Sequence, residues 1–161
     1  MGFLSTLFGD KLEKSEVAFV ATQRITSFDV GTANGSRILA EIDLDAAIAA
    51  HMNWKGRLTA YLSGASQAQL CAEDVCQDEL CPLGQWLYGP GRQSLGGHVS
   101  YPMLVTRHKQ FHAAAAKIIT LRESGDFDQA NAVLNGDYSR ASHHVICLLK
   151  NLKSNLRYIN L

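Results

Sequence analysis

The sequence has little of several features that would indicate a specialised class of protein. Its 15 basic and 15 acidic side chains balance, so no excess of positive charge is present to bind nucleic acid or an anionic membrane. Four cysteines among 161 residues are too few for a disulfide-rich secreted scaffold, and the chain shows no signal-peptide pattern. The apolar stretch over residues 1–8 is too short to cross a bilayer. We therefore expect a cytoplasmic protein without membrane insertion and without a nucleic-acid partner.

The sequence also lacks the alternation of strand and helix patterns that an α/β sheet requires. Apolar residues instead recur at helical spacing over about 36–63, 102–124 and 138–159. A shorter helix is expected after Asp126, broken at residues 135–137. These patterns predict an all-α fold, an up-and-down four-helix bundle with short additional helices and an N-terminal extension.

The segments between these helices give the expected boundaries. Ser36 is a candidate N-cap for the first long helix, and the glycine-rich and serine-rich run over 91–102 is expected to be a surface loop. Residues 19–30 carry β-branched and aromatic residues that would suit a hairpin or an extended arm. We accordingly divide the chain into an N-terminal extension of unknown role (1–35) and a helical domain (36–161).

Four residues of types that bind metals fall on this helical framework. His108 and His112 are four residues apart, which places their imidazoles on one helical face, about 6 Å apart along the axis. His51 lies on the inward apolar face of the first long helix. Cys81 immediately precedes the turn-forming sequence Pro-Leu-Gly, where a bent backbone could aim its sulfur. Three imidazoles and a thiolate form a ligand set that zinc prefers.

Each of these residues also has a simpler interpretation. A lone histidine on an apolar face is more often a buried structural residue, and Cys81 alone could be an inert buried thiol. Two neutral imidazoles side by side in a core are costly, however, unless they are hydrogen-bonded or bind a metal. A di-iron site is disfavoured because the chain lacks paired Glu-x-x-His motifs. Asp43, Asp45 or Glu79 could orient a ligand histidine, although solvated acids near helix starts are common.

The other cysteines and histidines are given other roles. Cys71 and Cys76 could form a disulfide or, with Cys81, an alternative thiol-rich site, although neither has the C-x2-C spacing of a zinc knuckle. Cys147 is expected to pack within the last helix. The histidines expected at the surface or in loops, of which the adjacent pair could bind metal adventitiously, are His98, His143 and His144.

Three motifs in this order resemble the chemoreceptor zinc-binding (CZB) domain family. They are AHMNWK (50–55), CPLGQWLYG (81–89) and HKQFH (108–112). The resemblance covers roughly residues 40–155 and leaves 1–35 outside. It implies a bacterial cytoplasmic sensory domain that binds one zinc ion, and the positions that match the ligands of the family are His51, Cys81, His108 and His112.

The resemblance also implies a role in signalling, including chemotaxis. CZB domains are usually attached to a chemoreceptor or a diguanylate cyclase, and zinc availability or oxidation of the zinc-bound thiolate, for example by hypochlorous acid, is the proposed signal. This sequence shows no output domain, so a stand-alone domain must signal to a separate partner of this kind, store or buffer zinc, or act through its N-terminal extension. Of these we expect signalling to a separate partner. The apolar face of the last helix and the family together favour a homodimer.

Two other functions compete with sensing. A zinc hydrolase needs an open metal position and a nearby general base, whereas four protein ligands leave no such position and no His-Glu-x-x-His motif is present. The chain is therefore expected not to be an enzyme. A structural adaptor, in which zinc only holds the helices together, is the nearer alternative.

Overall fold

The computed structural model describes residue 28 and residues 31–158. The arm predicted over residues 19–30 lies outside these residues apart from Phe28, and the boundary at residue 35 stays a prediction. The described residues form helices and no strand, which confirms the all-α prediction. In chain order the helices are α2 (Thr32–Glu41), α3 (Leu44–Leu62), α4 (Ala72–Cys76), α5 (Pro82–Tyr88), α6 (Pro90–Leu95), α7 (Tyr101–Glu123), α8 (Phe127–Val133), η1 (Leu134–Tyr138) and α9 (Ser139–Tyr158).

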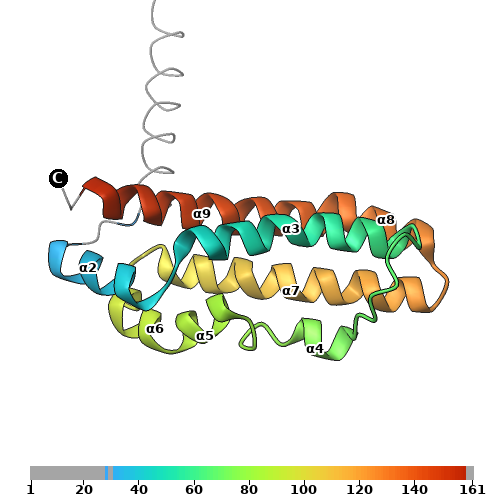
Figure 1. Ribbon diagram of the computed structural model, residues 1–161, viewed down its shortest axis with the longest axis horizontal. Helices are drawn as coiled ribbons and strands as arrows, with labels where there is room; N and C mark the ends of the chain where they lie inside the picture. The colour runs from blue at the N-terminus through green and yellow to red at the C-terminus, as the bar shows by residue number, and fades with distance from the viewer. Residues whose placement is uncertain (1–27, 29–30, 159–161) are drawn as a thin grey trace, which may run out of the picture.

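The chain runs along the long axis of the molecule four times, in alternating directions (Figure 1). α3 runs one way, the short helices α4, α5 and α6 return along α7, α7 runs forward again, and α8 to α9 return beside α3. The up-and-down four-helix bundle is thus confirmed, with one of its four passes made of three short helices. Since α4 and α9 both pack against α7, this helix lies at the centre of the bundle.

The core follows the apolar face predicted for the second long helix. Leu104, Phe111, Ala115 and Ile118 of α7 are all buried, together with His108 on the same face. Alanines at 114–116 are buried as well, and their small side chains allow neighbouring helices to approach closely. Among the described residues, the longest helices are too polar to cross a membrane.

The helix predicted from Ser36 is in fact two helices. Ser36 lies inside α2, and the chain then becomes extended at Ile42, with φ −146° and ψ 136°. Asp43 starts α3 by accepting a hydrogen bond from the Ala46 N–H at 2.9 Å. A carboxylate that satisfies a free N–H in this way stabilises a helix start, so the break falls at Asp43.

Two predicted irregular segments are also wrong. The helix is not broken at residues 135–137, because the π-helical turn η1 carries the chain directly from α8 into α9. The Ser139 hydroxyl donates to the Leu134 carbonyl at 2.7 Å and supports this wider turn. The run over 91–102 is not simply a surface loop, since α6 occupies its first half and Leu95 and Ser100 are buried.

Candidate metal centre

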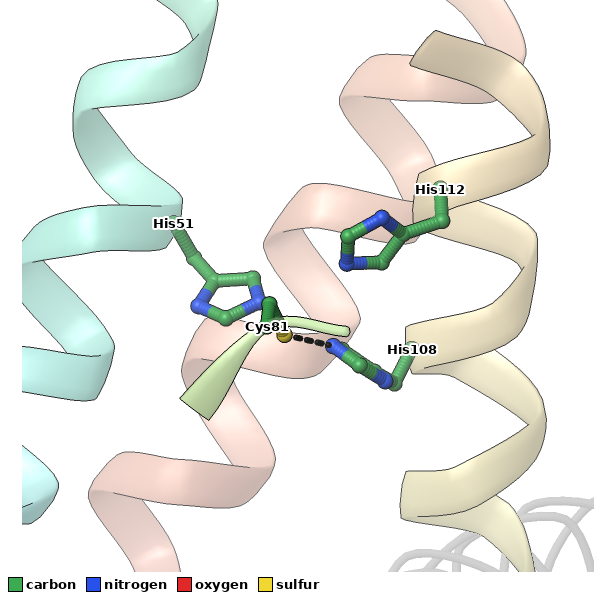
Figure 2. Close-up of side chains that lie close together, drawn as sticks. All are labelled: His51, Cys81, His108 and His112. Carbon is green, nitrogen blue, oxygen red and sulfur yellow. Dashed lines mark hydrogen bonds between the residues drawn. The ribbon is translucent and has the colours of Figure 1, made fainter. Parts of the chain in front are cut away.

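Three separate segments bring the four predicted ligands together. His51 comes from α3, Cys81 is the residue preceding α5, and His108 and His112 come from α7. One ligand atom from each of the four lies within 4.8 Å of the others. Figure 2 shows the three rings and the sulfur directed toward a common point. This is the spacing that a single metal ion bound by all four would need.

The orientation of two imidazoles leaves their metal-binding nitrogens without partners. His51 Nδ1 lies 2.7 Å from the Ala47 carbonyl oxygen, and His112 Nδ1 lies 2.7 Å from the Val75 carbonyl oxygen. A carbonyl accepts only, so each Nδ1 carries the proton and each Nε2 presents a lone pair. Both Nε2 atoms are buried and have no hydrogen-bond partner within the described residues. Because such atoms are costly to bury, the arrangement fits a cation at the common point.

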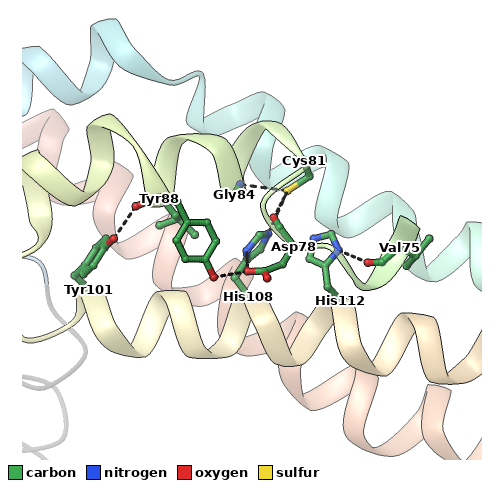
Figure 3. Close-up of polar contacts among 9 residues, drawn as sticks. Val75, Asp78, Cys81, Gly84, Tyr88, Tyr101, His108 and His112 are labelled. Atoms are coloured by element: carbon green, nitrogen blue, oxygen red, sulfur yellow. Dashed lines mark hydrogen bonds and ion pairs between the residues drawn. The ribbon is translucent and has the colours of Figure 1, made fainter. Parts of the chain in front are cut away.

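His108 is held between the sulfur and a buried carboxylate. Its Nε2 lies 3.3 Å from Cys81 Sγ, and its Nδ1 lies 3.5 Å from Asp78 Oδ2. Tyr88 donates its hydroxyl to the same oxygen at 2.6 Å, as Figure 3 shows. Asp78 is only 5% exposed, so its carboxylate contacts side chains of the site and not solvent. The contact at 3.5 Å is longer than a hydrogen bond, and His108 Nδ1 has no hydrogen-bond partner among the described residues, so Asp78 acts on this ring mainly through its charge.

Asp78 is the residue that sequence reasoning missed. Of the acids considered for this role, Asp43 caps α3 and Asp45 pairs with Lys153. Glu79 is exposed. Its position in the sequence could have identified it, because Asp78 lies only three residues before Cys81.

Cys81 has two backbone contacts that fix its sulfur. The Gly84 N–H donates to Sγ at 3.3 Å, so the cysteine caps the start of α5. The thiol also lies 3.6 Å from the Asp78 carbonyl oxygen. Cys81 is half-buried, in contrast to the three buried histidines. It is therefore the member of the group most accessible to small molecules.

Burial sets the protonation states of the four side chains. It lowers the pKa of His51 and of His112, and it lowers the pKa of His108 to about 2, so all three rings are neutral near pH 7. Burial raises the pKa of the Cys81 thiol, which favours its protonated form when no cation is near. A divalent cation reverses that preference and binds the thiolate. Neutral imidazoles and a thiolate are the forms that zinc requires.

The remaining cysteines do not take part in this group. Cys71 and Cys76 are exposed and free in the structure, so the considered disulfide is not formed and neither joins Cys81. The packing role predicted for Cys147 is wrong, because its side chain is exposed and its Sγ lies 3.4 Å from His143 Nε2. His143 is exposed and His98 lies in the turn between α6 and α7, as predicted, whereas His144 is half-buried within α9.

The turn around Cys81 depends on the absence of a side chain at Gly84. A Cβ atom at this position would lie 1.8 Å from the Asp78 carbonyl oxygen, far inside van der Waals contact. We expect Gly84→Ala to force apart the two turns that hold Asp78 and Cys81, and to lower the free energy of unfolding by about 2 kcal/mol. Urea denaturation measures this change.

Gly56 provides the matched control for that substitution. It lies within α3, and a Cβ added there meets no atom within 4 Å. Gly56→Ala should raise the free energy of unfolding by about 0.5–1 kcal/mol, because alanine is the better helix former. Equal effects of the two substitutions would contradict the close packing assigned to Gly84.

Replacement of Asp78 should weaken metal binding without removing a ligand. Asp78→Asn takes away the negative charge beside His108 Nδ1 while keeping the size of the side chain. We expect zinc affinity to fall about 10-fold, as is typical when the group that orients a ligand histidine is changed. Competition with a fluorescent chelator measures the affinity. Asp74→Asn, at an exposed position in α4, should leave it unchanged.

Comparison with protein families gives a match that includes the whole group. Residues 51–119 match the family model described as the chemoreceptor zinc-binding domain. This segment is a CZB domain. The matched range begins at His51 and contains Cys81, His108 and His112. Comparisons with curated proteins and with solved structures gave no match.

The family match bears on the identity of the metal. The geometry of the four side chains admits a metal ion, and the family is one of zinc-binding domains. The chain therefore contains a helical segment that matches a family of zinc-binding domains and places four possible metal ligands together. The family is a signalling family and not one defined by an enzymatic reaction.

Proposed function

We propose that His51, Cys81, His108 and His112 bind one zinc ion and that the chemical state of Cys81 is the signal that this domain senses. The observation that carries the proposal is the convergence of these four side chains from three segments. The buried, unpartnered Nε2 atoms of His51 and His112 support it further. A site with four protein ligands suits stable binding rather than catalysis, which needs an open position.

Cys81 is the reactive member of the site. Bound zinc stabilises the cysteine as a thiolate, the form that reacts with oxidants. In the net reaction with hypochlorous acid, an S–O bond forms, the O–Cl bond breaks, and sulfenic acid and chloride result. Two electrons pass from sulfur to chlorine. The half-buried position of Cys81 allows such a small molecule to reach the sulfur.

Oxidation of Cys81 would remove the link between the short helical pass and α3. Asp78 and Tyr88 tie the two ends of the segment around α5 to each other, and His108 is the contact of Asp78 on α7. A sulfenic acid is a poorer metal ligand than a thiolate, so the link from this segment to His51 on α3 would be lost. The segment can then shift relative to α3 and α7.

The signal would pass to a separate protein. The family name points to chemoreceptors, and we propose a chemoreceptor or a diguanylate cyclase as the partner, with the domain acting as a homodimer. The competing role is a structural zinc site that only ties α3, the α5 segment and α7 together. The same three-segment geometry favours that role too, so an experiment must separate them.

The test exposes zinc-loaded protein to one equivalent of hypochlorous acid. A chromogenic chelator reports released zinc, and light scattering coupled to gel filtration reports the oligomeric state. A variant with Cys71, Cys76 and Cys147 replaced by serine should release zinc as the wild type does, because these thiols are exposed and outside the group. Zinc release with a change in assembly supports sensing, and release without one supports the structural role. No release from the triple variant would contradict Cys81 as the sensor.

A further inference from the structure

An open cavity lies beside Cys81. It has a volume of about 580 Å³ and lies between the first turns of α3 and the short helix α5. Of the four converging side chains, His51 and Cys81 line it, while His108 and His112 do not. Figure 2 shows these two side chains on separate segments, His51 on α3 and Cys81 on the chain before α5. A molecule in the cavity can therefore reach the sulfur without displacing α7.

The walls of the cavity are mainly apolar and contain small side chains. Alanines at 46, 47 and 50 form the α3 side, and Pro82, Leu83 and Trp86 form the α5 side. The alanines leave space that larger residues at these helical positions would fill. The size of the cavity thus depends on the residue types of one face of α3.

The side chains that line the cavity offer no positive charge to pair with an anion. Neither lysine nor arginine appears among the described residues that line it. Glu41 is engaged by the Trp86 Nε1–H at 3.0 Å and by Arg37 at 3.2 Å, and Asp43 caps α3. An anion entering this space would lose its water next to two carboxylates and apolar walls, whereas a small neutral molecule would lose less.

We propose that this cavity is the access route by which small neutral oxidants reach Cys81, and that it excludes anionic ones. Hypochlorous acid and neutral hydroperoxides fit this class, whereas hypochlorite and carboxylate-bearing reagents do not. This inference rests on the proposed role of Cys81 as the reactive thiol of the zinc site. Selection among oxidants would then depend on the residues that line the cavity and not on the four metal-binding residues.

Two alkylating reagents of nearly the same size test the charge selectivity. Iodoacetamide is neutral and iodoacetate is an anion, and intact-mass spectrometry follows their reaction with Cys81. The protein is the full chain with Cys71, Cys76 and Cys147 replaced by serine, so that one thiol remains. Each rate is divided by the rate of the same reagent with free mercaptoethanol. We expect the normalised rate for iodoacetamide to exceed that for iodoacetate about fivefold or more.

A pair of alanine substitutions in the same protein tests the route itself. Ala50 lines the cavity, whereas its neighbour Ala49 is exposed on α3 and does not. Ala50→Leu should slow alkylation of Cys81 by iodoacetamide about tenfold, because the larger side chain narrows the passage. Ala49→Leu should leave the rate unchanged. Circular dichroism establishes that both variants keep the helical fold.

The outcomes separate this inference from the proposed function. Equal normalised rates for the two reagents, faster reaction with iodoacetate, or equal effects of the two leucine variants would each overturn the access route. Elemental analysis of the same zinc-loaded samples gives the zinc content independently. Normal zinc content with unselective alkylation would overturn the access route alone. Selective alkylation in a protein that binds no zinc would leave the cavity as a selective passage and overturn the proposed zinc site.

Discussion

Cys81→Ala is expected to lower zinc affinity about 100-fold, the largest effect of any single substitution considered for this protein. Structural zinc sites of four ligands bind with about 10–16 kcal/mol, so one ligand contributes on the order of 3 kcal/mol. Competition titration against a chelator of known affinity measures the change.

The chain supplies a control of the same chemistry. Cys147→Ala removes an exposed thiol on α9 that lies next to His143 and outside the group of four. It should bind zinc with wild-type affinity. If the two alanine variants bound zinc equally well, Cys81 could not be a ligand, and the sensing role proposed for its sulfur would be lost with it.

Removal of zinc is expected to lower the melting temperature of the wild-type protein by about 10 °C. Zinc held at about 1,000 times its dissociation constant adds about 4 kcal/mol to the folded state. For a chain of this length, each kcal/mol shifts the midpoint by about 2–4 °C. Bound zinc would connect α3, the α5 segment and α7. The unfolded chain cannot hold the four ligands in this arrangement. Differential scanning calorimetry with and without a chelator measures the shift.

His112→Ala and His143→Ala distinguish site-specific binding from general binding of zinc to histidines. His112 is buried in the centre, and its replacement should abolish most of the zinc-dependent shift. His143 is exposed on α9, and its replacement should preserve the shift. A shift that persists in His112→Ala would mean that zinc stabilises the protein from another position.

The sequence indicated which four side chains lie close together, but it did not indicate the path of the segment that carries Cys81. His108 and His112 share a helical face by their spacing alone, and His51 lies on the inward face by the same reasoning. The pass from α4 to α6 consists of helices too short to show periodicity. Its path depends on tertiary contacts, such as the hydrogen bond of the Tyr101 hydroxyl to the Leu87 carbonyl (2.6 Å, Figure 3).

Asp78 shows why the environment of the ligands could not be predicted. An aspartate in an acidic, polar segment is expected to be solvated. Burial of the Asp78 carboxylate becomes favourable only when Tyr88 and His108 both lie beside it. The break before α3 had a local signal in Asp43, but Ser36 was an equally good cap by residue type. The π-helical turn η1 keeps Tyr138 buried, which a local reading of Asn-Gly-Asp could not show.

The metal content of the purified protein tests the central claim most directly. Elemental mass spectrometry of the wild type beside Cys81→Ala and His112→Ala gives the zinc bound per chain under identical purification. We expect about one zinc per wild-type chain and substantially less in both variants. A correctly folded wild type without zinc, or variants that retain all of it, would contradict the assignment of His51, Cys81, His108 and His112 as its ligands.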